Sequence, residues 1–555
     1  MSVCKQCQSS FEITDRERVL RDQIASAVGG KNCVFPDPKL CPQCRRQRRL
    51  VFRNERHMYH RKCDLTGKQI IAIYPPDAPF PVYDSEAWFG NSWDPRDYGQ
   101  EFDFSRPFFE QFAELQKKVP RLSRVFLNNE NCDFCNIVGD SKNCYLIYGS
   151  IYCEDCYYGS PFYCKNCVDS LVIRRSEYCY ECIDSDTLYE CQYCQDCSTS
   201  HNLSFCYDLE GCRDCFMCVG LRHKQYYILN KLHSKADYEA KMKEIKLGSH
   251  SVIQHLKKQF QEFKLRFSHK FMSGTGNENV VGDHLYNSKD CYWTFFSQDC
   301  EGVGLSTQLL NAHHVLSCDY GEYGSFLYEV SGHYKVMNCA FCSWIWDNTS
   351  NLLYCEGATQ GSKDCFGCVS MKRGQYCILN KQYTKEEYER MVERIVEHMV
   401  KTGEWGQFFP PEYSLFGYNE TLAYDYFPLS KEEVLERGWK WRDDMGAKSY
   451  KGPLVEIPDL ISDTSDDICD KILICEVSGK PYKIIPQEFA FYRRFSIPLP
   501  RRCPDVRYYD RLALRNPCYL WNRECAKCKK PIQTSYAPER PETVLCEECY
   551  LNEVY

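Results

Sequence analysis

Cysteines spaced as Cys-x-x-Cys stand near both ends of this 555-residue chain, two pairs at each end. The thiolates of two such pairs can surround one Zn²⁺ ion as a closed tetrahedron, which is the arrangement of structural zinc sites of the zinc-ribbon type. We therefore predict one structural zinc ion in each end module. The predicted ligands are Cys4, Cys7, Cys41 and Cys44 in the first module and Cys525, Cys528, Cys546 and Cys549 in the last.

The two ends of the chain also match each other. An offset of 462 residues pairs Cys41 with Cys503 and Cys63 with Cys525, and an offset of 471 pairs Cys4 with Cys475. Each end keeps one complete cysteine set and has lost part of a second. The counterparts of the first set are Cys475, Ser478, Cys503 and Val506, and those of the last set are Cys63, Thr66, Asp84 and Ala87. We interpret the ends as two copies of one module that once held two zinc sites.

Further Cys-x-x-Cys pairs occupy the interior, among them the stretch YECQYCQDC at residues 189–197. Additional predicted zinc ligands are Cys191, Cys194, Cys215 and Cys218, and Cys339, Cys342, Cys365 and Cys368. The alternative is an iron–sulfur or thiol redox centre, although the Cys-Pro element of ferredoxin-type runs is absent. Cys197 is matched by Ile345 in the second half of the interior. We interpret it, with most other central thiols, as a small buried apolar residue.

A basic segment, RRQRRLVFRNERHMYHRK at residues 45–62, carries eight Lys or Arg residues and one acidic residue. Such a segment beside a zinc ribbon predicts contact with nucleic acid or the ribosome through phosphate groups. The alternative is a helix whose arginine stems pack against the protein while Leu50, Val51 and Phe52 face inward. The predicted contact residues are Arg45, Arg46, Arg48, Arg49, Arg53, Arg56, Arg61 and Lys62.

The interior that separates these modules is itself repeated. GCRDCFMCVGLRHKQYYILNK at residues 211–231 reappears as GSKDCFGCVSMKRGQYCILNK at residues 361–381. In the first copy, cysteines recur at 132, 144, 156, 167, 179 and 191, with short Tyr-, Val- and Ile-rich segments between Gly, Ser, Asp and Asn. This pattern predicts short strands and turns at a fixed interval. We expect a β-solenoid whose coil spans two steps, about 23–24 residues.

A helix is predicted after each repeat block. Ser234 with Asp237, and Thr384 with Glu387, have the spacing of a capping box at a helix N-terminus. Apolar residues at 252, 256, 260, 263 and 267 then form a stripe at helical spacing, which predicts a helix packed on a neighbouring element.

The expected fold class is therefore α+β and β-rich, with two zinc-ribbon end modules flanking two duplicated, Cys- and Tyr-rich, β-solenoid-like blocks. The expected boundaries are a zinc-ribbon module at 1–90, a helical connector at 91–129, repeat block 1 at 130–232, helices at 233–275, repeat block 2 at 276–382, helices and a linker at 383–455, an acidic linker at 456–470, and the second zinc-ribbon module at 471–555.

Composition points to a folded protein of the cytoplasm. Aromatic residues make up 15% of the chain, the formal net charge is −7, and no apolar run of about 18 residues is present. The first residues contain no apolar core of a secretion signal, so we expect a reducing, cytoplasmic location and no membrane contact. Walker, GxGxxG, GxSxG and HExxH motifs are absent.

The leading functional hypothesis is a zinc-binding, non-catalytic protein that binds a macromolecule, nucleic acid or protein, or serves as a scaffold. Besides the redox alternative, an enzyme or ligand binder acting along a solenoid face stays open. The sequence leaves the oligomeric state open.

Three segments carry a resemblance to a known family: CVGLRHKQYYILNK at 218–231, LFGYNETLAYDYFPLSKEEV at 415–434 and TSYAPERPETVLCEECY at 534–550. The chain resembles, over nearly its whole length, an uncharacterised family of cysteine-rich zinc-ribbon proteins from candidate-phylum bacteria. This resemblance implies zinc-ribbon ends and no known activity, so it implies no catalytic residues.

Overall fold

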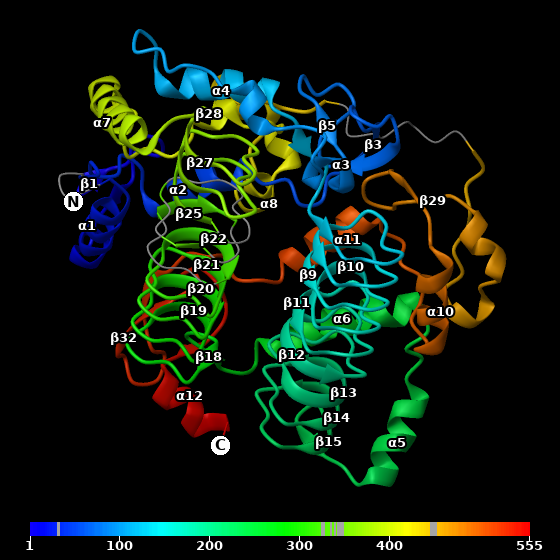
Figure 1. Cartoon of the computed structure of the whole chain (residues 1–555). Helices are drawn as coiled ribbons and strands as arrows, with labels where there is room; N and C mark the ends of the chain where they lie inside the picture. The colour runs from blue at the N-terminus through cyan, green and yellow to red at the C-terminus, as the bar shows by residue number, and fades with distance from the viewer. Residues whose placement is uncertain are drawn as a thin grey trace.

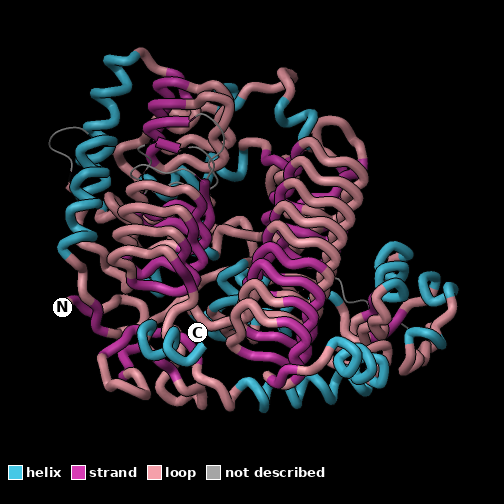
Figure 2. The backbone as a smooth tube through the Cα atoms, turned by 90° about the horizontal axis from the view of Figure 1, so that it is seen from below, coloured by secondary structure: helices cyan, strands magenta, loops and turns pink. Residues whose placement is uncertain are grey.

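Two β-solenoids stand side by side as separate stacks of coils, with helices and small two-stranded sheets around them (Figures 1 and 2). The computed structural model describes residues 1–29, 34–322, 328–332, 336–337, 340, 349–443 and 452–554. The prediction of a mixed, β-rich fold with solenoid blocks is confirmed, and the coils account for most of its strands.

The first solenoid is one sheet of ten short strands in chain order, all parallel except for the last pair. Its strands are β7 (Phe126–Leu127), β8 (Asn136–Gly139), β9 (Tyr145–Ile151), β10 (Tyr157–Phe162), β11 (Leu171–Arg174), β12 (Ile183–Tyr189), β13 (Ser198–Tyr207), β14 (Arg213–Val219), β15 (Gln225–Ile228) and β16 (Lys231–Leu232).

Nearly every third residue of the first solenoid has a left-handed backbone. Asn131, Phe134 and Ile137, for example, have φ angles of 51°, 50° and 55°. Residues that directly follow these positions, such as Cys132 and Cys135, are buried in the interior. Because non-glycine residues rarely adopt this conformation, its regular return marks a turn built into the fold. A coil thus consists of three-residue sides separated by left-handed corners.

A coil spans one step of the cysteine repeat, so the prediction of two steps per coil is wrong. Tyr189 pairs with His201, and His201 pairs with Arg213 on the next strand. Stacked positions in neighbouring coils are 12 residues apart, as Ser141 and Cys153 are. One coil of the first solenoid is a residue shorter, because the pairing shifts between Ser160 and Pro161. The regular return of cysteine in the sequence therefore marks single coils, each with four sides.

Cysteine and serine side chains inside the coils bond to the backbone. Cys144 Sγ donates to the carbonyl oxygen of Lys142, two residues earlier, at 3.2 Å. Ser141 Oγ makes the same contact with Gly139 at 2.8 Å and accepts from the backbone N–H of Cys153 at 3.0 Å. A small side chain with a hydrogen to donate thus fits the narrow interior without leaving a polar group unpaired.

The second solenoid repeats this design with coils of 11 to 13 residues, since Val281 pairs with Tyr292, Phe295 with Thr307 and Leu352 with Cys365. Its described strands are β18 (Gly274–Thr275), β19 (Val281–Tyr286), β20 (Tyr292–Gln298), β21 (Thr307–Leu310), β22 (Leu316–Glu322), β23 (Tyr328–Ser331), β24 (Val336–Met337), β25 (Thr349–Leu353), β26 (Lys363–Phe366), β27 (Gln375–Ile378) and β28 (Lys381–Gln382). Cys339 and Cys342 lie outside the described residues.

The helices after the solenoids confirm the capping predictions. α5 (Lys235–Glu244) begins where Ser234 accepts a hydrogen bond from the backbone of Asp237, and α7 (Lys385–Thr402) begins with a complete capping box at Thr384. α6 (His250–Lys264) packs its apolar stripe, including Phe260, on aromatic residues of β13 and β14. Asp459, in the segment predicted as an acidic linker, accepts hydrogen bonds from Ser249 and Ser251 at the start of α6.

The end modules contain elements that recur at matching positions. The first module has β1 (Ser2–Val3), β2 (Ser10–Phe11), α1 (Asp15–Gly29), α2 (Pro42–Leu50), β3 (Tyr59–Lys62), β4 (Gln69–Ala72), β5 (Val82–Tyr83) and α3 (Ser85–Phe89). The last has β29 (Leu473–Ile474), β30 (Pro481–Tyr482), α10 (Pro486–Arg494), α11 (Pro504–Leu512), β31 (Trp521–Glu524), β32 (Pro531–Thr534), β33 (Val544–Leu545) and α12 (Glu547–Val554). The hairpins β3–β4 and β31–β32 have the same register, and α2 and α11 each begin at a proline after a cysteine.

Each end module reaches the solenoid that is distant in sequence. α2 lies against β22 and β23 of the second solenoid, and α11 lies against β10 and β11 of the first. The remaining elements are α4 (Phe108–Lys118), β6 (Arg121–Leu122), β17 (His269–Lys270), α8 (Leu422–Tyr426) and α9 (Lys431–Glu436). None of the described helices combines the length and apolar character needed to cross a lipid bilayer.

Candidate metal centres

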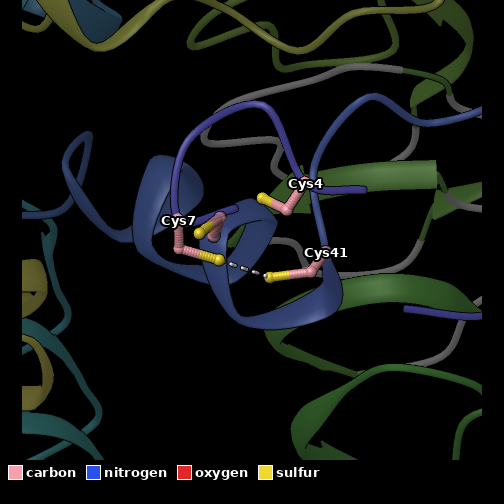
Figure 3. Close-up of side chains that lie close together, drawn as sticks. Cys4, Cys7 and Cys41 are labelled. Carbon is pink, nitrogen blue, oxygen red and sulfur yellow. Dashed lines mark hydrogen bonds between the residues drawn. The ribbon is translucent and has the colours of Figure 1, made fainter. Parts of the chain in front are cut away.

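The first module brings its four predicted thiols together. The sulfur atoms of Cys4, Cys7, Cys41 and Cys44 lie within 4.8 Å of one another. Figure 3 shows the side chains of Cys4, Cys7 and Cys41 converging, with 3.7 Å between the sulfurs of Cys7 and Cys41. Sulfurs bound to one tetrahedral Zn²⁺ at about 2.3 Å lie about 3.8 Å apart, so this group fits the ion.

The last module forms a second group of the same kind. The sulfur atoms of Cys525, Cys528, Cys546 and Cys549 also lie within 4.8 Å of one another, and those of Cys528 and Cys546 are 3.6 Å apart. The backbone N–H of Cys546 donates to Cys525 Sγ at 3.3 Å. Both predicted groups of four cysteines are therefore confirmed as places where a metal ion fits.

In each group the surroundings favour a thiolate at one cysteine and disfavour it at another, since the neighbouring Cys41 thiol raises the pKa of Cys44 and burial raises that of Cys549 to about 12. The thiol of Cys44 lowers the pKa of Cys41 to about 5, outweighing the opposing effect of burial. At Cys525, burial raises the pKa, but backbone N–H groups of Cys528 and Cys546 outweigh it and bring the value to about 6. Since a thiolate is the form that binds metal, each group already holds a ligand in its binding state near neutral pH.

The counterparts of these groups keep the turn but only part of the ligand set. The residue four positions after the first cysteine is left-handed in all four turns, at Gln8, Gly67, Gly479 and Lys529. In the first module, Thr66 Oγ1 donates to Asp84 Oδ2 at 3.1 Å, where the last module has Cys528 beside Cys546. In the last module, Ser478 Oγ lies 3.5 Å from Cys503 Sγ. In each incomplete set, a hydrogen bond thus occupies the position where the complete set has two neighbouring thiols.

The interior cysteines predicted as further ligands do not form one site. Cys191, Leu203 and Cys215 occupy the same position in three successive coils, so they form a column with Leu203 in the middle. Cys191 and Cys215 are therefore two coils apart. Strands spaced about 4.8 Å apart place these two thiols about 10 Å apart, too far to share an ion. Cys194 and Cys218 are separated by Cys206 in the same way. The prediction of a zinc site from this set is wrong.

In the second solenoid, Cys365 and Cys368 are buried and donate to backbone carbonyls two residues earlier, as the thiols of the first solenoid do. Their predicted partners, Cys339 and Cys342, lie outside the described residues. In the stretch YECQYCQDC at residues 189–197, Cys191, Cys194 and Cys197 stand on successive sides of one coil, each buried and each donating to the carbonyl two residues before it.

The basic segment is not an exposed surface. Arg45 and Arg49 are 1% and 2% exposed, and Arg49 Nε lies 3.1 Å from Asp319 Oδ2 in the second solenoid. Arg56 lies over the ring of Tyr508 at 3.5 Å. The other arginines are also largely buried, each in an ion pair: Arg46 with Asp319, Arg48 with Glu329, Arg53 with Glu55 and Arg61 with Asp64. Of the predicted contact residues only Lys62 is exposed, so the expected phosphate-binding surface is absent among them.

The structure contains a third group of possible metal ligands, which was not predicted from the sequence. Ligand atoms of Asp184, Asp196 and His284 lie within 4.8 Å of one another, two from the first solenoid and one from the second. Asp184, Asp196 and Asp208 occupy left-handed corners of successive coils, so they form a column on one face. The repeated spacing was visible in the sequence, but the histidine opposite them was not.

This column faces a cavity of about 340 Å³ between the two solenoids. Charged residues of both signs line it, with His284, Tyr286 and Gln298 from the second solenoid and Tyr550 from α12. Tyr550 donates to Asp208, which also pairs with Arg222 at 2.9 Å. Charged and apolar groups thus share the lining of the cavity, which is bounded by elements from three parts of the chain.

Comparisons with known proteins give no identity. No protein-family model matches the chain, and no curated protein does. Among solved structures, the chain is similar to a candidate acetyltransferase from Desulfovibrio desulfuricans G20, at 8% identity and a TM-score of 0.10, over 50% of this chain and 82% of that one. A likeness this weak carries no conclusion about fold or activity.

Proposed function

We propose that the protein is a zinc-binding scaffold whose two four-thiolate sites fasten the end modules to the solenoids. The observation that carries this proposal is that each thiol group encloses the start of a helix that contacts a solenoid. Cys41 and Cys44 flank the start of α2, whose Arg49 pairs with Asp319. Cys546 and Cys549 flank the start of α12, whose Tyr550 bonds to Asp208.

A zinc ion with four thiolates has no open position, so its role here is structural. Membership of the uncharacterised zinc-ribbon family and work in a reducing, cytoplasmic setting are part of the same proposal. The basic segment is not the contact surface, because its arginines are used inside the protein.

Elemental analysis with a visible spectrum tests this proposal on protein purified without oxygen and treated with a mild chelator. We expect two zinc ions per chain and no visible absorbance. Stoichiometric iron with a cluster spectrum would instead support the iron–sulfur alternative. If removing zinc leaves the unfolding temperature unchanged, the proposal that zinc fastens the end modules to the solenoids is wrong.

A second candidate function, ligand binding between the solenoids, is favoured by the cavity there. Its volume of about 340 Å³ falls in the range of small-molecule sites, and charged groups of both signs line it.

A further inference from the structure

We propose that Asp184, Asp196 and His284 bind one divalent transition-metal cation at the cavity between the solenoids. This inference rests on the second candidate function and names the class of ligand. It concerns residues outside both thiol groups.

The distances between the three side chains suit a single ion. His284 Nε2 lies 2.8 Å from Asp196 Oδ1, and both side chains have ligand atoms within 4.8 Å of an oxygen of Asp184. Neighbouring ligands held at about 2.1 Å around one ion stand roughly 3 Å apart. The side chains therefore need little movement to share a cation.

One oxygen of Asp184 has no hydrogen-bond partner among the residues that the structure describes. Arg515 Nε donates to Asp184 Oδ2 at 2.8 Å, while Asp184 Oδ1 is buried without a hydrogen bond. The side chain is only 2% exposed. Leaving a carboxylate oxygen buried and unpaired is costly, and a cation bound at this oxygen removes that cost.

His284 faces another carboxylate on its far side, in an ion-pair contact that lacks hydrogen-bond geometry. Its Nδ1 lies 3.3 Å from Asp283 Oδ1. Asp283 is fixed in turn by the backbone N–H of Ser273 at 2.8 Å and by the hydroxyl of Ser535. The imidazole ring stacks on Phe296 at 4.5 Å. These contacts direct Nε2 toward the aspartates of the other solenoid.

The charges around the site also favour a dication. Asp184, Asp196 and Asp283 bring three negative charges, and Arg515 brings one positive charge. A divalent cation with a neutral His284 makes this group neutral, whereas a protonated His284 alone leaves one negative charge. Two carboxylates with one imidazole are ligands that suit Mn²⁺, Fe²⁺ or Zn²⁺.

Mn²⁺ is the probe that separates this site from the thiol groups, because it prefers oxygen and nitrogen ligands to sulfur. The experiment titrates Mn²⁺ into the zinc-loaded full chain and follows it by electron paramagnetic resonance. We expect one bound Mn²⁺ per chain and a ¹⁴N coupling from one imidazole. Asp196→Asn and His284→Gln should each weaken binding about tenfold or more.

Asp186→Asn is the matched control, since Asp186 lines the same cavity but pairs with Arg175 outside the group. It should leave Mn²⁺ affinity unchanged. A wild-type protein with two zinc ions that binds no Mn²⁺, or binds it without ¹⁴N coupling, overturns the inference. In that case the Asp196–His284 contact is an ion pair only, and the zinc scaffold stands. If a variant loses zinc or helix content, the wild-type ¹⁴N signal decides the question.

Discussion

Arg49 and Arg511, which occupy matching positions in the two end modules, make equivalent contacts with different solenoids. Arg49 Nε lies 3.1 Å from Asp319 Oδ2, and Arg511 Nη1 lies 2.8 Å from Asp169 Oδ1. Both ion pairs are almost completely buried. Each end module therefore uses the same arginine of the same helix to bind the solenoid that is remote from it in sequence.

Loss of one such arginine should weaken the fold strongly. Arg511→Met leaves Asp169 with Arg507 alone, and breaking a buried pair costs about 3–5 kcal/mol. Urea unfolding of the zinc-loaded protein measures this change. Arg502→Met is the control, since Arg502 is 40% exposed and its pairs should contribute about 0–1 kcal/mol. Equal losses in both variants would contradict the role given to Arg511.

Zinc content should depend on cysteines of the two complete groups only. Cys7→Ser and Cys528→Ser each remove one of four ligands, so each variant should hold about one zinc ion fewer per chain than the wild type. Elemental analysis measures the content. Cys469→Ser is the control, because this half-exposed cysteine belongs to neither group. Unchanged zinc in Cys7→Ser and Cys528→Ser would refute the assignment.

The thiol of Cys197 should be replaceable by a hydroxyl. Cys197 Sγ donates to the carbonyl of Gln195 at 3.3 Å, and Ser185, one coil earlier in the same column, donates to Ile183 at 2.8 Å. Cys197→Ser keeps this hydrogen bond and should change the free energy of unfolding by about 1 kcal/mol or less. Metal content should not change. A loss of iron or zinc in this variant would support a metal role for the central cysteines.

Protonation of His269 should lower the free energy of unfolding in acid. Burial lowers the pKa of His269 to about 4 from its ordinary value of 6.5, and Lys264 adds to the shift. Because the unfolded chain takes up the proton more readily, the stability is complete above pH 6.5 and is lost as pH falls toward 4. The loss between pH 8 and pH 5 is about 2 kcal/mol.

His269→Gln should remove this part of the pH dependence. Acid also weakens thiolate binding to zinc, but it does so in both proteins, so the difference between their urea unfolding curves at pH 8 and pH 5 isolates the histidine. Parallel curves for variant and wild type would show that another group is responsible.

The sequence predicts the solenoid and both thiol groups because each rests on local, repeated spacing. Cysteine returns at a nearly constant step, and each Cys-x-x-Cys pair forms its own turn. The coil length is harder to predict, since one step per coil and two steps per coil give the same periodicity. The pairing of residues 12 positions apart on neighbouring strands, such as Tyr189 with His201, separates the two.

The basic segment and the aspartate column depend on partners that are distant along the chain. Arg49 looks exposed in the sequence because Asp319 is 270 residues away. Asp184 and Asp196 lie one coil apart, but the ring of His284 reaches them from the other solenoid. Side chains that meet only when two solenoids pack together leave no local pattern to detect.

Because each coil has four three-residue sides, one whole coil is the natural unit by which this chain can lengthen or shorten during evolution. Gaining or losing one whole coil keeps every inward position in its column. A change of one residue must instead be accommodated inside one coil, as in the 13-residue step from Leu352 to Cys365, both of which stay buried. The shorter coil at Ser160–Pro161 shows that a single missing residue is absorbed at one place. Tandem copying of the codons for one coil is therefore the route by which related genes should differ in length.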